Sequence, residues 1–204
     1  MGDPKFSRRI FRRPSHPWEG ERIKMENELL KKYGLKNKKE LWKAQSVLRR
    51  FRQRARQLQA LVRYGDPQAG KEKDELIGRL GRLGVLPIEG ASLDDVLALD
   101  VEAVLSRRLQ TLAFVKGLAF TPTQARQFIV HGHVAIGDRR VTVPGYLVKR
   151  TEEVVIAYDP RSPISHDMHP ARPGVPPAEA APESAPGPAA PAPVGGPAPG
   201  GASP

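Results

Sequence analysis

The chain has 204 residues, a formal net charge of +11 and no cysteine. The charge favours a polyanionic partner, and the lack of cysteine excludes disulfides and thiolate zinc sites. No stretch approaches the roughly 18 apolar residues of a membrane-spanning helix, and no apolar signal core follows the basic N-terminus. We therefore expect a cytosolic protein with no membrane partner.

The charge is unevenly distributed along the chain. Residues 1–64 contain 19 Lys and Arg against 6 Asp and Glu, residues 65–104 contain 4 against 9, and residues 105–170 contain 9 against 5. Two basic regions therefore flank an acidic one. This pattern predicts a protein that holds a folded RNA from two sides.

Residues 1–18 show no hydrophobic period and contain three prolines, so we expect an extended basic arm that becomes ordered on RNA. A basic tail without a defined path is the alternative. The arm is predicted to dock at His16 to Trp18, with Trp18 packed on the first helix. Its candidate RNA-binding residues are Arg8, Arg9, Arg12 and Arg13.

Two helices are predicted to follow the arm. Residues 19–33 place Met25, Leu29 and Tyr33 on one face, and Gly34 ends this helix. The second helix begins near Asn37 and carries a narrow apolar stripe for about seven turns. The stripe consists of Leu41, Ala44, Leu48, Phe51, Ala55, Leu58 and Val62.

The second helix also has a basic side. A coiled-coil seam is one alternative, but the stripe lasts only about three heptads and lacks paired acidic flanks. We therefore expect a core helix whose basic side faces RNA. Its candidate RNA-binding residues are Arg49, Arg50, Arg54 and Arg56.

Residues 65–72 are predicted to form a loop containing Gly and Pro, and residues 73–83 to form a helix. The glycines at positions 78, 81 and 84 do not indicate a phosphate-binding loop, because no Lys-Ser or Lys-Thr pair follows them. We expect them to serve helix packing and capping.

Three further helices are predicted from capping residues. Ser92 begins a short helix through Leu99, and Asp100 caps a helix from Val101 to Lys116. Thr121-Pro122-Thr123-Gln124 then combines a Thr cap, a Pro at the first helical position and a Gln at the third. This capping box predicts a helix from Pro122 to about His131.

Short strands are predicted after this helix. Val134 and Ile136 alternate with smaller neighbours, and Gly137-Asp138 offers a hairpin turn to a returning strand at Arg139 to Val141. Strands are also expected at 146–148 and 154–156. The fold class predicted is a mostly α chain with a small α+β unit, in which two helices pack on a small twisted sheet.

Polar side chains are concentrated in this small α+β unit, residues 105–158. Amides, guanidiniums and imidazoles of this kind bond phosphate oxygens, 2′-hydroxyls and base edges. An ordinary solvated face is the alternative, and a histidine pair without a third ligand is weak support for a metal site. We expect Arg107 and Arg108 on the exposed side of the helix from Val101. The candidate RNA-binding residues are Arg107, Arg108, Thr121, Gln124, Arg126, Gln127, His131, His133, Arg139 and Arg140.

This unit resembles the RNA-binding domain named after small-subunit ribosomal protein S four. The matching text is RRLQTLAF and KGLA, then TPTQARQFIVHGHVAI and VPGYLV. The domain also occurs in pseudouridine synthases, some aminoacyl-tRNA synthetases and heat-shock RNA-binding proteins. The resemblance therefore implies RNA binding through the candidate residues above. It does not by itself imply a particular role.

The wider layout is similar to the archaeal and eukaryotic ribosomal protein S four family. The similarity rests on MGDPK, RRPSHPW, YGLKNKKELWKAQSVLRRFRQRAR and SLDDVLALDVEAVLSRRLQT, and extends over residues 1–165. It implies a primary binder of the five-way junction in the 5′ domain of small-subunit rRNA. It also implies a role in nucleating the subunit body and in translational accuracy, beside ribosomal protein S five and the channel by which mRNA enters.

Four regions are expected: an arm at 1–18, a helical region at 19–104, the RNA-binding domain at 105–165, and a disordered Pro/Ala/Gly-rich tail at 166–204. The alternatives are a stand-alone RNA chaperone and an RNA-modifying enzyme with the same domain. Residues 1–104 are too short for a catalytic domain of that kind. We therefore expect no enzymatic activity, cofactor, metal or small-molecule substrate.

Overall fold

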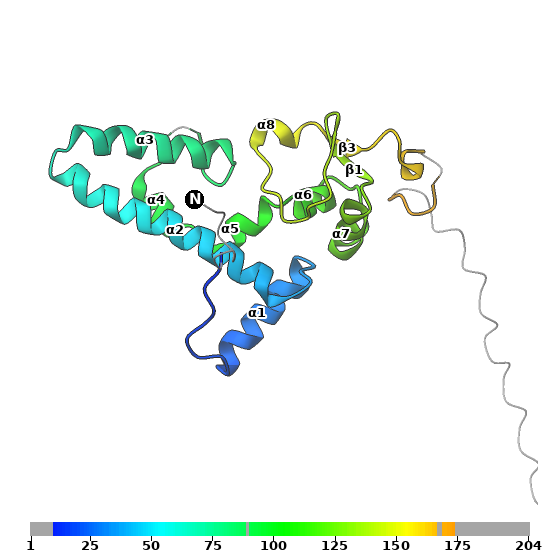
Figure 1. The fold of residues 1–204 in the computed structure, drawn as a ribbon, viewed down its shortest axis with the longest axis horizontal. Helices are drawn as coiled ribbons and strands as arrows, with labels where there is room; N and C mark the ends of the chain where they lie inside the picture. Colours follow the sequence, from blue (N-terminus) through cyan, green and yellow to red (C-terminus); the bar gives the residue numbers. More distant parts are fainter. Residues whose placement is uncertain (1–9, 89, 167–168, 174–204) are drawn as a thin grey trace, which may run out of the picture.

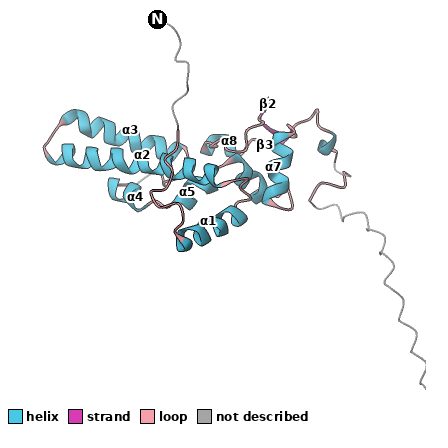
Figure 2. Cartoon of the chain, turned by 60° about the horizontal axis from the view of Figure 1, so that its bottom comes forward, coloured by secondary structure: helices cyan, strands magenta, loops and turns pink. Residues whose placement is uncertain are grey.

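The structure is a computed structural model that describes residues 10–88, 90–166 and 169–173. The predicted arm residues Arg8 and Arg9 and most of the predicted tail lie outside the described residues. Helices make up most of the described chain, and the strands are confined to the end that carries α7 (Figure 2).

The first three helices are α1 (Gly20–Lys32), α2 (Lys38–Arg63) and α3 (Pro67–Arg82). The apolar stripe predicted for α2 is confirmed over most of its length, because Leu41, Ala44, Leu48, Ala55 and Leu58 are buried. Phe51 is half-buried, and the stripe ends before the exposed Val62. Helices α2 and α3 run antiparallel as a long hairpin that projects from the rest of the chain (Figure 1).

The loop predicted for residues 65–72 is wrong. Helix α3 begins at Pro67, and the Asp66 carboxylate caps it by accepting a hydrogen bond from the Gln68 N–H at 3.0 Å. An acidic cap followed by Pro at the first position is a standard helix start. Two of the three glycines have the expected roles, since Gly81 packs against Ile88 and Gly84 ends the helix at a φ of +69°. The role expected for Gly78 is wrong, because this residue is exposed inside α3 and nothing lies within 4 Å of an added Cβ.

Helix α4 (Leu93–Ala98) begins at the predicted Ser92 with a reciprocal capping box to Asp95. The single helix predicted from Val101 to Lys116 is wrong, because α5 (Val101–Ser106) and α6 (Leu109–Val115) are separate. Residues 107–109 instead bond to the segment at 146–148. The Leu109 N–H donates to the Tyr146 carbonyl at 2.8 Å, and the Val148 N–H donates to the Arg107 carbonyl at 3.0 Å.

Helix α7 (Pro122–Val130) begins at the predicted Pro122, and the Thr121 hydroxyl caps it by accepting from the Gln124 N–H at 3.1 Å. The predicted capping box is not complete, because the Gln124 side-chain oxygen accepts from the Phe120 N–H and not from the Thr121 N–H. Gly117 and Gly132 end α6 and α7 in the left-handed region, with φ of +74° and +75°. This backbone conformation is nearly free of strain only for glycine.

A three-stranded antiparallel sheet packs beside α6 and α7, in the order β2-β1-β3 (Figure 1). The strands are β1 (Val134–Ile136), β2 (Arg139–Arg140) and β3 (Ile156–Tyr158). The first two confirm the predicted hairpin. The predicted strand at 154–156 is displaced, because α8 (Arg150–Glu153) precedes it and pairing starts at Ile156.

The segment predicted as a strand at 146–148 forms only one bridge, from Leu147 to Arg108. A single 3-10 turn, η1 (Pro163–Ser165), follows β3 among the described residues. No helix among the described residues has the length and apolar character needed to cross a membrane.

Three hydrophobic clusters hold the described chain together. The first lies between α6, α7 and the sheet, the second between α2, α3 and α4, and the third between α1, α2 and α5. The third cluster also takes in Leu147 from the segment before α8. The helical region at 19–104 and the small α+β unit at 105–158, called the sheet-containing unit below, therefore share apolar contacts.

The arm docks differently from the prediction. Trp18 is 90% exposed, so its predicted packing on the first helix is wrong. The Phe11 ring instead lies 6.1 Å from the Trp42 ring of α2. Met25 is also exposed, and the position that α1 buries is Glu26. Glu26 is held by Arg22 at 2.8 Å, Lys38 at 3.2 Å and the Trp42 indole N–H at 3.1 Å.

Candidate nucleic-acid interface

Four of the predicted arginines converge where the arm crosses α2. Arg12 and Arg13 of the arm and Arg49 and Arg50 of α2 are all exposed, and all line one hollow of about 430 Å³. The arm is fixed there by the Arg12 N–H, which donates to the Ser46 hydroxyl at 3.2 Å. The Arg50 guanidinium also donates to the Ile10 carbonyl at 3.4 Å. Among the described residues, no carboxylate lines this arm hollow, so its positive charge is uncompensated within that part of the chain.

The other two predicted arginines of α2 are exposed as well. Arg54 forms an ion pair with Glu72 of α3. Arg56 has no hydrogen bond or ion pair with any described residue. The basic side predicted for α2 is therefore present, and one of its cations is shared with a neighbouring helix.

Arg107 and Arg108 do not lie on the exposed side of a helix, and this part of the prediction is wrong. The Arg107 side chain is only 12% exposed, and its guanidinium donates to the Glu153 carboxylate at 2.8 Å. It also lies against Gly84, where an added Cβ would be 2.9 Å from its Cζ atom. The Arg108 side chain is 7% exposed and donates to Glu40 at 2.8 Å. Both arginines therefore join parts of this chain.

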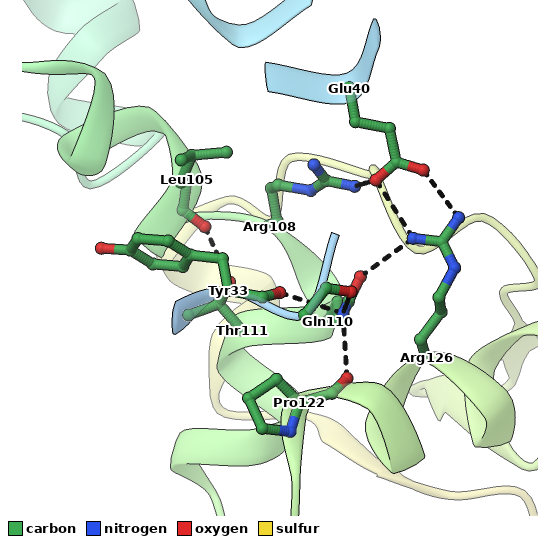
Figure 3. Close-up of polar contacts among 9 residues, drawn as sticks. Tyr33, Glu40, Leu105, Arg108, Gln110, Thr111, Pro122 and Arg126 are labelled. Atoms are coloured by element: carbon green, nitrogen blue, oxygen red, sulfur yellow. Dashed lines mark hydrogen bonds and ion pairs between the residues drawn. The ribbon is translucent and has the colours of Figure 1, made fainter. Parts of the chain in front are cut away.

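Glu40 is the centre of a buried junction between α2 and the sheet-containing unit (Figure 3). Its Oε1 atom accepts from Arg126 Nη2 at 2.7 Å, and its Oε2 atom accepts from Arg126 Nη1 at 3.1 Å and from Arg108. Burial alone would raise the pKa of Glu40, but the hydrogen bonds from Arg126 and Arg108 outweigh it, and the pKa lies below its ordinary value.

Gln110 completes this junction. Its side chain is buried, and its amide nitrogen donates to the carbonyls of Tyr33, Gly34 and Pro122 at 3.1, 2.8 and 2.9 Å (Figure 3). Gly34 follows α1, and Pro122 opens α7. One side chain of α6 therefore ties the helical region to the sheet-containing unit.

Two predicted residues at the start of α7 have local structural roles. Thr121 caps the helix, and the Gln124 side-chain oxygen accepts from the Phe120 N–H at 2.7 Å. The Gln124 amide nitrogen donates to the Ala171 carbonyl at 3.1 Å, so this side chain also fixes the segment after η1. Thr121 is exposed, and Gln124 is half-buried.

The predicted amide and histidines near the end of α7 lie together. Gln127 and His131 are exposed and bonded to each other at 3.0 Å. The ring of His133 stacks 6.2 Å from that of His131, and its Nδ1 atom is 2.8 Å from the Ser162 hydroxyl. Burial, together with the nearby charges of His131 and Arg140, lowers the pKa of His133. The described residues contain no group of three or more His, Asp or Glu arranged to hold a metal ion.

The two arginines of β2 are exposed on the edge of the sheet. The Arg140 guanidinium already forms one ion pair, because its Nε atom donates to the Asp159 carboxylate at 2.6 Å. Arg139 has no ion pair with any described residue. Both guanidiniums retain exposed surface that a phosphate could reach.

Two further cations and the junction residues Glu40 and Gln110 were not among the predicted site residues. Arg79 and Arg82 of α3 are exposed and three positions apart, hence on one face of the helix. They were missed because they lie in the segment with net negative charge. Glu40 and Gln110 were missed because nothing local signals a partner that is far away in sequence.

Comparisons with known proteins agree with this geometry. The model of the S4 domain matches residues 107–154, which include α6, α7 and the first two strands. Small ribosomal subunit protein uS4 of Picrophilus torridus is 53% identical over 172 residues, which cover 84% of this chain and 93% of that protein.

Two other archaeal relatives show the same extent of similarity. The uS4 protein of Methanococcus aeolicus is 52% identical over 172 residues, covering 84% of this chain and 96% of that protein. The protein of the same name from Thermoplasma volcanium is 49% identical over 186 residues, covering 91% and 92%. This similarity includes the helical region as well as the S4 domain, and the chain therefore belongs to the family of small ribosomal subunit protein uS4.

Proposed function

We propose that the chain is a structural constituent of the small ribosomal subunit and binds its rRNA. The observation that carries this proposal is the arm hollow, where Arg12, Arg13, Arg49 and Arg50 converge from two separate segments and no described lining residue is a carboxylate. An uncompensated cluster of guanidiniums favours phosphate groups over any neutral ligand. Because the chain belongs to the uS4 family, we infer that the phosphate groups are those of small-subunit rRNA.

The finer role is proposed from the family resemblance. It comprises primary binding at the five-way junction of the rRNA 5′ domain, nucleation of the subunit body, and a contribution to accuracy near the channel by which mRNA enters. The partners are rRNA, ribosomal protein S five and mRNA at that channel, and the location is the cytoplasmic ribosome. No step of this role requires catalysis, a cofactor or a metal ion.

The proposed RNA-binding residues fall into two groups. One group is exposed and suited to direct contact, and it consists of Arg12, Arg13, Arg49, Arg50, Arg54, Arg56, Gln127, His131, Arg139 and Arg140. In the other group, Arg107, Arg108, Gln124, Arg126 and His133 bond to protein groups, and Thr121 caps α7. We propose that this second group mainly positions the surfaces of the first.

Two basic surfaces at a fixed spacing suit shape recognition of a folded RNA. The arm hollow lies between the arm and α2 of the helical region at 19–104, whereas β2 belongs to the RNA-binding domain at 105–165. The junction at Glu40 and Gln110 holds these two proposed domains together. RNA whose phosphates match both surfaces at once gains affinity without being read base by base. Binding would thereby increase the population of that RNA fold.

Filter binding tests the proposal. The full chain is titrated against an rRNA 5′-domain fragment and against a fragment of the same composition with a scrambled fold, at several salt concentrations. The proposal predicts tight, salt-sensitive binding to the native fragment and much weaker binding to the scrambled one. Equal binding to both RNAs would contradict it and would indicate a non-specific RNA chaperone.

A further inference from the structure

A second groove lies between α2, α3 and the segment 147–149, and the arm hollow adjoins it. Its volume is about 870 Å³. Five cations line it, namely Arg50, Arg54, Arg79, Arg82 and Lys149. Among the described residues that line the groove, one is a carboxylate, Glu75. The charge of this α2–α3 groove is therefore strongly positive, and it suits a polyanion.

Two of these cations are free of protein partners among the described residues. Arg79 and Arg82 have no hydrogen bond or ion pair with any described residue, and both are exposed. The others are partly engaged, since Arg54 pairs with Glu72, and Lys149 lies 3.7 Å from Glu152. The free guanidiniums of the groove thus belong to α3.

The rest of the lining is apolar. It consists of Val47, Phe51, Leu76, Leu83 and Leu147, and each of these side chains is only partly buried. We call these apolar residues the floor of the groove and its cations the rim. Proteins that bind single-stranded nucleic acid combine a positively charged groove with aromatic side chains in the same way. Phosphates bond the rim, and an unstacked base covers the floor. A duplex cannot fill such a groove, because its bases are already stacked on each other.

We propose that the α2–α3 groove binds an unpaired nucleotide of RNA, with its phosphates at Arg79 and Arg82 and its base on the floor at Phe51 and Leu83. This inference deepens the proposed function and rests on it for the identity of the natural RNA. Arg50 lines both the arm hollow and the groove, so the two form one basic track across α2. RNA whose phosphates are bound at the arm hollow would reach the groove along this track.

The test compares two RNA probes on the full chain, oligouridylate and an RNA duplex of the same length. The variant Arg79→Ala/Arg82→Ala should weaken oligouridylate binding at least about tenfold, and reduce its salt slope by about 0.7 for each lost phosphate contact. Duplex binding should change less than about threefold, since its main site is elsewhere. The matched control Lys71→Ala/Arg63→Ala removes two exposed cations outside the groove and should change neither affinity.

A second variant tests the floor. Leu83→Ala should weaken oligouridylate binding several-fold, because it removes apolar area that the base covers. Its salt slope should stay unchanged, because every phosphate contact remains. Unchanged oligouridylate binding in either variant, or equal weakening for oligouridylate and duplex, would overturn the proposal. These outcomes do not depend on whether the parent chain prefers native over scrambled rRNA. The proposal for the groove can therefore be refuted while the proposed rRNA-binding function is retained.

Discussion

The carboxylate of Glu40 and the guanidinium of Arg126 are 86 positions apart in the chain, and their closest atoms, Oε1 and Nη2, are 2.7 Å apart. Arg108 donates to the same carboxylate at 2.8 Å. One acidic side chain at the start of α2 therefore pairs with two arginines of the S4 domain. We regard this contact as the main polar link between the two parts of the molecule.

Glu40→Gln should destabilise the protein substantially. The substitution leaves two largely buried guanidiniums without a carboxylate, and breaking a buried ion pair from one side costs about 3 kcal/mol of unfolding free energy. For a chain of this size, each kcal/mol lowers the melting temperature by roughly 2–4 °C. Thermal unfolding followed by circular dichroism measures the change. Glu28→Gln, on the exposed face of α1, is the matched control and should melt like the parent.

The stability should depend on pH through the same residue. The pKa of Glu40 lies below its ordinary value in the folded chain, so its contribution is fully present above the pKa of the unfolded state. That contribution is lost as the pH falls through the folded pKa. Denaturant unfolding between neutral pH and about pH 3 should therefore show a shallower pH dependence for Glu40→Gln than for the parent. Parallel curves would contradict this role.

Gln110→Met should weaken the junction without changing its charge. The substitution removes the donor that serves three carbonyls, those of Tyr33, Gly34 and Pro122, and leaves them without that partner. We expect a loss of about 2 kcal/mol in unfolding free energy. Gln57→Met, at an exposed position of α2, is the control. If both variants unfold at the same denaturant concentration, Gln110 does not link the two parts.

Gly34→Ala should be more harmful than Gly65→Ala. Both glycines have positive φ, +58° and +80°, so either substitution introduces backbone strain of about 1 kcal/mol. Only Gly34 is also crowded, since its Cβ would lie 2.8 Å from the Cβ of Pro122, whereas nothing lies within 4 Å at Gly65. The difference between the two melting temperatures measures how closely α7 approaches the end of α1.

Local signals in the sequence predicted much of the fold. The capping residues Ser92 and Thr121 and the terminator Gly132 act on their own neighbours, and the helix ends that they predict are present. The Asp66-Pro67 start has the same kind of signal and was overlooked. The break at Arg107 could not be predicted in this way, because its cause is pairing with residues about 40 positions later.

The sequence predicted which residue types make up the candidate interface, but not which of their side chains are exposed to solvent. The basic side of α2 and the arginines of β2 are exposed as their helical and hairpin positions predict. Arg108 and Arg126 have the same side chain but are largely buried, because Glu40 lies opposite them in the fold. Whether an arginine faces solvent or a carboxylate is decided by tertiary contacts, and sequence spacing does not contain that information.

We expect the exposed arginines, and not the buried ones, to contact RNA directly. The most direct measurement is the salt dependence of binding to the rRNA 5′-domain fragment for the parent chain and for Arg49→Ala/Arg50→Ala. Both side chains are exposed, so the variant should fold normally. We predict that its salt slope decreases by about 0.7–0.9 for each lost phosphate contact, with weaker binding at every salt concentration. A folded variant with the slope and affinity of the parent would contradict the claim.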